Sequence, residues 1–225
     1  GTNDAAVITG TKVFELVETN AALTTSGTLT ATDKDGTPLF TAETVTGTYG
    51  SLKMTTTGAW TYTAASAQDQ LSAGVKATDV FTIHAADGTA STITVNITGT
   101  NDAAVISGTS IINLIETDAV LTTTGTLTST DVDGIANAFT VETVKGVYGS
   151  LSMAANGTWT YTASSAQDQL AAGAKATDVF TVHTADGTAS SITVNITGTN
   201  DAAVISGSKV FELTETNDAL KTSGV

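Results

Sequence analysis

The chain has 225 residues, with 22 acidic residues against eight basic ones and a net charge of −14 at pH 7. Such a surface repels phosphate groups, so we predict neither nucleic acid nor anionic lipid as a partner, whereas cations are favoured. The chain has no cysteine, which excludes disulfides and thiolate metal sites. No apolar run reaches the ~18 residues of a membrane helix, so we expect no direct membrane insertion.

One octapeptide, Gly-Thr-Asn-Asp-Ala-Ala-Val-Ile, occurs three times, at Gly1–Ile8, Gly99–Ile106 and Gly198–Ile205. Most of the sequence between the copies repeats as well. We therefore predict a first domain over 1–98, a second over 99–197, and over 198–225 the start of a third that is too short to fold alone. An array of whole domains is typical of a protein that provides length and spacing.

Within each unit, short stretches of alternating apolar and polar residues predict β-strands separated by turn sequences. In chain order, the first unit has a hairpin over 51–63 that turns at Thr57-Gly58, a helical turn or two over 64–73, and strands over 80–83 and 92–98. The second unit repeats these as a hairpin over 150–162 that turns at Asn156-Gly157, a short helical segment over 163–172, and strands over 179–182 and 192–197. For Asn-Gly we expect the positive φ angles of a tight hairpin.

About seven short strands per unit, with turn signals every eight to twelve residues, are typical of an all-β Greek-key β-sandwich. We expect the large apolar side chains on these strands to form one core per unit. In the first unit these are Phe14, Leu29, Phe40, Leu52, Trp60, Tyr62, Phe81 and Val95. Their counterparts are Ile112, Leu127, Phe139, Leu151, Trp159, Tyr161, Phe180 and Val194.

Acidic residues gather in the predicted turns at matched positions of the two units. Each unit has an Asp-x-Asp-Gly turn and an Ala-Asp-Gly turn between its last two strands, an Asn-Asp pair at the junction, and a Glu after the first strand. Carboxylates two residues apart on a turn can share a hard cation such as Ca²⁺, which takes six to eight oxygen ligands. The alternative for Asp-x-Asp-Gly is an ordinary β-turn, because Asp and Gly favour turns for local reasons.

Other known site types are not supported by the sequence. The twelve-residue EF-hand loop and the glycine-rich nonapeptide calcium roll are missing. Each unit has one histidine, at His84 and His183, on an expected strand, and no Gly-x-Ser-x-Gly motif is present. Glu43 and Glu142 lie in evenly duplicated units without a cleft-building insertion, which argues against a glycosidase. We therefore predict that the chain is not an enzyme.

Residues 81–87 followed by 93–102, with the Gly-Thr-Asn-Asp junction as the most specific element, resemble the VCBS repeat of large bacterial surface proteins, a cadherin-like family. The family's usual Pro after Asn-Asp-Ala is replaced by Ala104 and Ala203. The resemblance implies an extracellular location on a bacterial cell surface. It also implies a giant RTX-type adhesin, exported by type I secretion, that holds Ca²⁺ outside the cell.

Cadherin domains place calcium at domain junctions, and the resemblance implies three sets of ligands here. We name them the central junction, the N-terminal cluster and the C-terminal cluster. The central junction comprises Glu18, Asp69, Asn101, Asp102, Asp131, Asp133 and Asp186. The N-terminal cluster comprises Asn3, Asp4, Asp33, Asp35 and Asp87, and the C-terminal cluster comprises Glu116, Asp168, Asn200 and Asp201.

Two features of these sets set the expected ion count. Gln68-Asp69-Gln70 stands where cadherins carry Asp-x-Glu, so one or two ions are expected at the central junction rather than three. The C-terminal cluster has no following Asp-x-Asp within this sequence, so we expect it to bind weakly or not at all.

From these patterns we predict calcium-rigidified extender repeats that project a distal adhesive region for cell adhesion or biofilm formation. Neighbouring repeats of the same chain are the expected partners, and a glycan or surface protein would be bound by other regions of the parent protein. The alternative is that the repeats themselves bind a glycan or a like domain on another cell.

Overall fold

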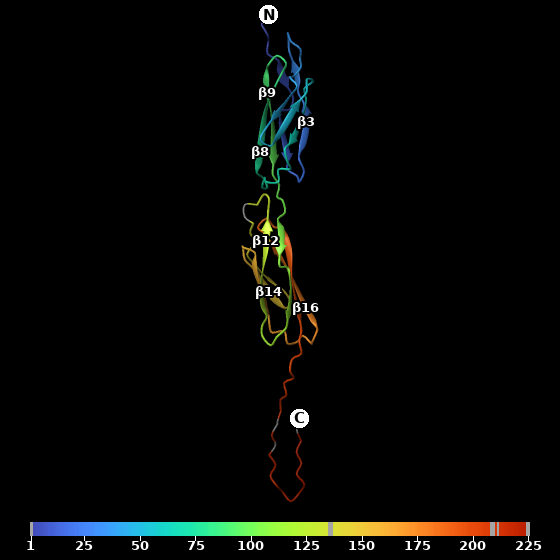
Figure 1. The fold of residues 1–225 in the computed structure, drawn as a ribbon, viewed down its shortest axis with the longest axis vertical. Helices are drawn as coiled ribbons and strands as arrows, with labels where there is room; N and C mark the ends of the chain where they lie inside the picture. Colours follow the sequence, from blue (N-terminus) through green and yellow to red (C-terminus); the bar gives the residue numbers. More distant parts are fainter. Residues whose placement is uncertain (1, 135–136, 208–209, 211, 224–225) are drawn as a thin grey trace.

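The computed structural model describes residues 2–223 except 135–136, 208–209 and 211. Two similar units of β-strands lie end to end along the long axis of the molecule (Figure 1). The described residues contain strands, turns and irregular segments but no helix, and hence no helix long and apolar enough to cross a membrane. The predicted all-β class is confirmed.

The first unit is a sandwich of two sheets. Its strands are β1 (Val7–Thr9), β2 (Val13–Val17), β3 (Thr24–Thr28), β4 (Thr30–Thr32), β5 (Glu43–Thr46), β6 (Gly50–Met54), β7 (Ala59–Ala64), β8 (Lys76–His84) and β9 (Ala90–Thr98). One face has the order β3-β7-β6-β5, extended by the pair β1-β4, and the other has the order β2-β9-β8. Only the β2–β9 pairing is parallel.

The second unit repeats this arrangement. Its strands are β10 (Val105–Gly108), β11 (Ile111–Ile115), β12 (Thr122–Thr130), β13 (Glu142–Lys145), β14 (Gly149–Met153), β15 (Thr158–Ala163), β16 (Lys175–His183) and β17 (Ala189–Thr197). The sheets have the orders β10-β12-β15-β14-β13 and β11-β17-β16. Here β12 runs unbroken where the first unit has β3 and β4.

The first strand of each unit changes sheets midway, which explains why more than seven strands are observed. β1 pairs with β4 in one sheet, and after Gly10 the chain continues as β2 beside β9 in the other sheet. Gly10 has a φ of 123°, a region that side-chain-bearing residues avoid. With the two halves of this strand and the β3–β4 pair each counted once, both units have seven strands, as predicted.

The predicted hairpins are confirmed as β6–β7 and β14–β15, but the expected turn geometry at Asn156-Gly157 is wrong. Gly157 has a φ of 81°, whereas Asn156 is not among the residues with positive φ. Instead, the Asn156 side chain accepts a hydrogen bond from the Thr158 amide at 3.0 Å. This is a local side-chain contact that replaces a left-handed backbone at Asn156.

The short helical segments predicted over 64–73 and 163–172 are also wrong, because the chain forms turns after β7 and β15. Gln68 and Gln167 both have a φ of 71°, which interrupts a right-handed helix. The Gln68 side chain is buried and donates to the Tyr49 carbonyl at 3.3 Å. A tertiary contact therefore overrides the helical preference of an alanine-rich segment.

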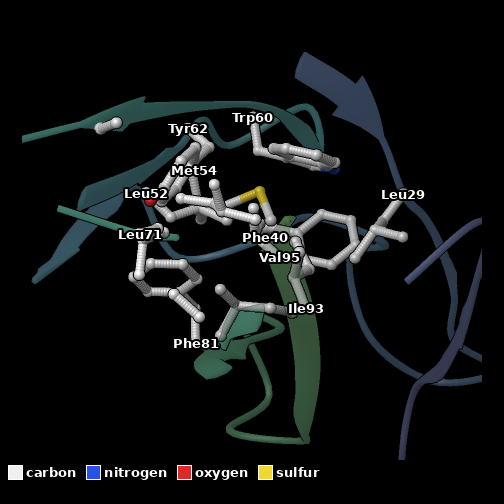
Figure 2. Packing of buried hydrophobic residues seen from close by; sticks show 14 residues of the cluster. Leu29, Phe40, Leu52, Met54, Trp60, Tyr62, Leu71, Phe81, Ile93 and Val95 are labelled. Atoms are coloured by element: carbon white, nitrogen blue, oxygen red, sulfur yellow. The ribbon is translucent and has the colours of Figure 1, made fainter. Parts of the chain in front are cut away.

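The core of the first unit lies between its two sheets, where Trp60, Tyr62, Leu52 and Phe81 belong to one cluster of buried side chains (Figure 2). Of the sixteen predicted core residues, fourteen are buried, while Phe14 and Ile112 are only partly buried and pack against the core edge. Phe14 still contacts Trp60 edge-on, with ring centroids 4.5 Å apart. The Trp60 ring packs directly against the backbone of Gly27, and a Cβ atom at this position would collide with the ring.

After Thr197 the chain continues away from the second unit (Figure 1). We expect Glu215, the counterpart of Glu18 and Glu116, to follow a strand in the same way, but the described residues of 199–223 form no strand. Val204 and Ile205, which correspond to the start of β10, are 95% and 76% exposed. In the second unit Val105 and Ile106 pair with β12, whereas Val204 and Ile205 pair with no strand among the described residues.

Candidate metal centre

The central junction begins with three carboxylates from separate turns of the first unit and its exit. Glu18 follows β2, Asp69 lies in the turn after β7, and Asp102 lies in the segment that joins β9 to β10. One carboxylate oxygen from each lies within 4.8 Å of the other two. This spacing allows a single cation to contact all three residues.

The second unit adds Asp131, Asp133 and Asp186 from two loops that face the first unit. Asp131 and Asp133 lie after β12, where the Asp133 amide donates to Asp131 Oδ1 at 3.3 Å. With Asn101 and Ser72 these three acidic residues line one depression between the units. Ser72 of the first unit also donates directly to the Asp133 carbonyl, at 2.6 Å. The seven predicted residues of the central junction thus form two neighbouring sets: Glu18, Asp69 and Asp102 make up one group, and Asn101, Asp131, Asp133 and Asp186 line the depression beside it.

The connecting segment is held at both ends by carboxylates. The amide and hydroxyl of Thr100 donate to Glu18 Oε2, the amide at 3.1 Å. The Ala104 amide donates to Asp186 Oδ2 at 3.1 Å. Between these points the Asn101 side-chain amide donates to the Asp102 carbonyl at 2.8 Å. The linker is thus fixed to both units, and its own side chains face the acidic cluster.

Several of these carboxylates are buried without a hydrogen-bond donor. In the described part of the chain, ten buried side-chain polar atoms lack a partner, and six of them are carboxylate oxygens of predicted ligands: Glu18 Oε1, Asp33 Oδ2, Asp69 Oδ1, Asp102 Oδ2, Glu116 Oε1 and Asp133 Oδ1. Glu18 is only 2% exposed. An unpaired buried charge costs several kcal/mol unless a counter-charge is present. No lysine forms a salt bridge with these residues in the ranges that the structure describes.

A buried acid with a purely structural role looks different. Asp79, at 4% exposure, accepts hydrogen bonds from the amides of Thr48 and Tyr49, at 2.7 Å and 3.1 Å. Asp178 holds the same turn in the second unit. Burial, together with the charge of Asp79, raises the pKa of Tyr62 to about 12. Because Asp79 and Asp178 are satisfied by backbone donors, they need no cation, in contrast to the junction carboxylates.

The electrostatics of the central junction reflect this crowding. Burial, and then the charges of Glu18, Asp69 and Asp131, raises the pKa of Asp102. Burial and the proximity of Asp133 and Asp186 raise the pKa of Asp131. Both shifts have the sign expected when like charges are gathered away from water. A bound divalent cation would remove this penalty.

Asp186 has a second role that the sequence did not indicate. Burial alone would raise its pKa, but hydrogen bonds from the Thr184 and Thr188 hydroxyls and from the Thr188 and Ala104 amides lower it well below the usual range. These four donors occupy most of the lone pairs of a carboxylate. Asp186 therefore anchors the linker, and it has less capacity for a metal ion than Asp102 or Asp133.

The N-terminal cluster repeats the downstream half of this arrangement. The Asp4 amide lies 3.2 Å from Asp35 Oδ1, and the Ala6 amide donates to Asp87 Oδ2 at 2.8 Å. Hydrogen bonds from the Thr89 hydroxyl, its amide and the Ala6 amide lower the pKa of Asp87 to about 2. The Asn3 side chain donates to the Asp4 carbonyl at 3.2 Å, as Asn101 does to Asp102. The predicted residues therefore meet here too, without a preceding Glu.

The C-terminal cluster repeats the upstream half, with one residue that the sequence analysis missed. Glu116 and Asp201 lie within 4.8 Å of Asp118, which follows β11. Burial, and then the charges of Glu116, Asp168 and Asp118, raises the pKa of Asp201, so Asp168 also lies nearby. The Asn200 side chain donates to the Asp201 carbonyl at 3.2 Å. Asp118 escaped notice because the equivalent residue in the first unit is Asn20.

The two histidines take part in edge contacts rather than in a site. His84 Nδ1 lies 3.3 Å from Glu43 Oε1, and its amide donates to the same oxygen at 3.2 Å. The contact joins β8 of one sheet to β5 of the other, and His183 and Glu142 repeat it. It therefore closes an open side of the sandwich.

Comparison with solved structures shows the fold. Protocadherin gamma B2 extracellular cadherin domains 1–5 match with a TM-score of 0.52 and 13% identity, over 89% of this chain and 40% of that chain. Protocadherin gamma B7 EC3-6, solved as a cis-dimer, matches with a TM-score of 0.51 and 16% identity, over 87% of this chain and 48% of that chain. The chain thus spans less than half the length of these structures. No match was found among curated proteins.

Comparison with protein-family models gives a match to the bacterial cadherin-like domain at residues 3–99 and again at residues 101–198. The two matches cover both sandwiches and together account for most of the chain. The chain therefore belongs to the bacterial cadherin-like domain family, of which it carries two tandem copies.

Proposed function

We propose that the chain is part of the extender region of a bacterial cell-surface adhesin, in which Ca²⁺ at the junctions stiffens a row of cadherin-like domains. The proposed domain limits are residues 98 and 197, where β9 and β17 end. The observation that carries the proposal is the set of buried carboxylate oxygens without a donor at the central junction. The RTX-type adhesin, its type I secretion and its extracellular site remain part of this proposal.

The residues present fit calcium better than other ions. The free oxygens of Glu18, Asp69, Asp102 and Asp133 are hard ligands from four separate segments. Ca²⁺ accepts six to eight such ligands in flexible geometry, whereas Mg²⁺ demands near-ideal octahedral geometry and retains its waters. Nitrogen and sulfur ligands, which zinc prefers, do not occur in the cluster.

Each side chain has a distinct part in the proposed mechanism. Glu18, Asp69 and Asp102 bring the charge of the first unit and the linker to the junction, and Asp131 and Asp133 bring that of the second. With calcium bound, the ion links the two units; without it, the carboxylates repel one another and the junction bends. Extracellular calcium modules have a Kd of ~10⁻⁴–10⁻³ M, so the site fills outside the cell and stays empty at cytosolic calcium levels.

Direct recognition of a partner by the repeats has less support. Among the described residues the exposed large apolar side chains are all aliphatic, and stacking platforms for sugars are aromatic. The two copies also present the same loops to solvent. We therefore assign the repeats a mechanical role without catalysis, and leave ligand binding to other regions of the parent protein.

Small-angle X-ray scattering of the 225-residue chain tests the proposal. We expect a longer and stiffer particle in millimolar calcium than in chelator, with Mg²⁺ at the same concentration as the control. Identical scattering profiles in calcium and chelator would mean that the acidic loops are ordinary turns, and the extender mechanism would be wrong.

A further inference from the structure

A comparison of the two ends of the second unit points to a residue that neither the repeat pattern nor the family resemblance identifies. At its C-terminal end, Glu116 is 1% exposed, and its two carboxylate oxygens have different surroundings. Oε2 accepts the amide and hydroxyl of Thr199, at 2.9 Å and 2.8 Å. Oε1 is buried and has no donor in the described part of the chain. The Glu116 carboxylate lies in the group formed with Asp118 and Asp201.

Position 118 differs in chemistry from its counterpart in the first unit. Asn20 has a side-chain amide that can donate a hydrogen bond, and its proximity lowers the pKa of the Asp102 carboxyl, against the burial and neighbouring charges that raise it. Asp118 when ionised can only accept. Asp118 therefore adds a negative charge to the group of Glu116, Asp168 and Asp201. Asn20 adds no charge to the equivalent group of the first unit. Two carboxylates two residues apart, Glu116 and Asp118, also have the spacing with which a turn can hold a hard cation.

We propose that Asp118 is a cation ligand that completes a Ca²⁺ site within the second repeat and its exit segment. Glu116, Asp118, Asp168 and Asp201 then bind the ion without the Asp-x-Asp loop of a following domain. Such a repeat loads calcium before its neighbour docks. The first repeat, with Asn20, needs Asp131 and Asp133 of the next domain for the same purpose. This inference rests on the proposed calcium function, and it replaces our expectation of weak or absent binding at the C-terminal cluster.

The two sites have separate reporters in the backbone. The Thr100 amide donates a hydrogen bond to Glu18, and the Thr199 amide donates one to Glu116. The chemical shift of each amide therefore reports on its own cluster. We would titrate CaCl₂ into the ¹⁵N-labelled 225-residue chain at about 0.15 M salt, which screens long-range charge effects. In the wild-type chain we expect saturable shifts of both amides with separate midpoints.

Asp118→Asn is the decisive variant, because asparagine is nearly isosteric with aspartate and is the residue at this position of the first unit. The Asp118 side chain is exposed, so the substitution does not disturb the core. We expect the Thr199 midpoint to rise at least tenfold in calcium concentration, with the Thr100 midpoint unchanged. The matched variant Asn20→Asp should lower the Thr100 midpoint and leave that of Thr199 as it was. Unchanged signals elsewhere in the spectrum report intact folding.

The outcomes separate this inference from the function on which it rests. If Thr100 responds to calcium but Asp118→Asn leaves the Thr199 midpoint unchanged, or if Thr199 never responds, Asp118 is not a ligand and the extender function still stands. If neither amide responds at calcium concentrations up to about 10 mM, which is on the order of ten times the upper Kd of extracellular modules, both proposals are wrong.

Discussion

The central junction and the C-terminal cluster start from the same residue types but differ in what surrounds them. Each has a buried Glu after the first strand, an Asp in the turn after the hairpin and an Asn-Asp pair at the exit. At the central junction, Asp131, Asp133 and Ser72 bring the next unit into contact with this set. At the C-terminal cluster no following loop is present among the described residues, and Asp118 stands beside Glu116 instead. We therefore propose that the same motif serves as half of a shared site at one end and as a self-contained site at the other.

The largest expected effect comes from removing one buried glutamate at each place. Glu18→Gln removes a buried ligand charge at the central junction, and we expect its calcium affinity to fall about a hundredfold, or ~2.7 kcal/mol. In calcium, this variant should scatter like the wild-type chain in chelator. Glu116→Gln is the matched control, because it acts on the C-terminal cluster and should leave the junction stiff. Equal scattering of both variants in calcium would contradict the distinction.

The contrast between partnered and unpartnered buried acids provides a second test. Asp79→Ala leaves the amides of Thr48 and Tyr49 without an acceptor, so we expect the free energy of unfolding of the first unit to fall by about 2 kcal/mol, with or without calcium. Asp102→Ala relieves repulsion and should not destabilise the calcium-free chain. Chemical denaturation of both variants in calcium and in chelator gives the measurement. Loss of stability in calcium-free Asp102→Ala would show that Asp102 is a structural acid like Asp79.

A smaller effect is expected from the direct contact between the units. Ser72→Ala removes the hydrogen bond to the Asp133 carbonyl and should weaken docking of the units by about 1 kcal/mol. Ala171 occupies the equivalent position of the second unit, so alanine is compatible with the fold. Residual dipolar couplings of the two units in limiting calcium should show greater inter-unit motion in the variant. No change relative to the wild-type chain would mean that the ion alone links the units.

The smallest effect concerns pH. The pKa values of Asp102 and Asp131 are raised in the folded chain, so the folded state binds protons that the unfolded state does not as pH falls from neutrality toward about 4. The free energy of unfolding of the calcium-free chain should therefore rise slightly over that window. Below it, Asp87, with a pKa of about 2, acts in the opposite sense, and its stabilising contribution is lost as pH falls from about 4 toward 2.

Thermal denaturation between pH 7 and 2 checks this profile. Calcium should remove the rise toward pH 4, because protons then compete with the ion for Asp102 and Asp131. A calcium-free profile that falls steadily from pH 7 would show that these two carboxylates are not crowded by their neighbours.

Much of the fold could be predicted because local patterns and tertiary packing agree over most of each unit. Trp60 and Tyr62 alternate with threonines on one strand, and that alternation places both aromatic rings in the core. The helical prediction for residues 64–73 failed where the two levels disagree. There, the buried Gln68 side chain reaches the Tyr49 carbonyl, and the backbone adopts a left-handed conformation that no alanine-rich pattern signals.

The sequence predicted which residues form the candidate site, but not how each carboxylate is buried and hydrogen-bonded. Repetition of the acidic loops indicated Glu18, Asp102 and Asp133, yet a sequence does not show that their oxygens are buried without donors. Nor does it show that the Asp186 carboxylate accepts hydrogen bonds from four donors. Asp118 was missed because it is a single difference between copies, and such differences gain meaning only when the neighbouring carboxylates are located.

The sequence by itself determined the repeat, the strands, the absence of disulfide or thiolate chemistry, and the acidic turns, because all of these follow from local patterns and residue types. Only the tertiary structure decided which carboxylates meet, which are satisfied by backbone amides and which remain without a partner. The physical reason is that hydrogen bonding and desolvation depend on neighbours that are distant in the chain. Glu18 and Thr100 are 82 residues apart yet share a hydrogen bond at the junction.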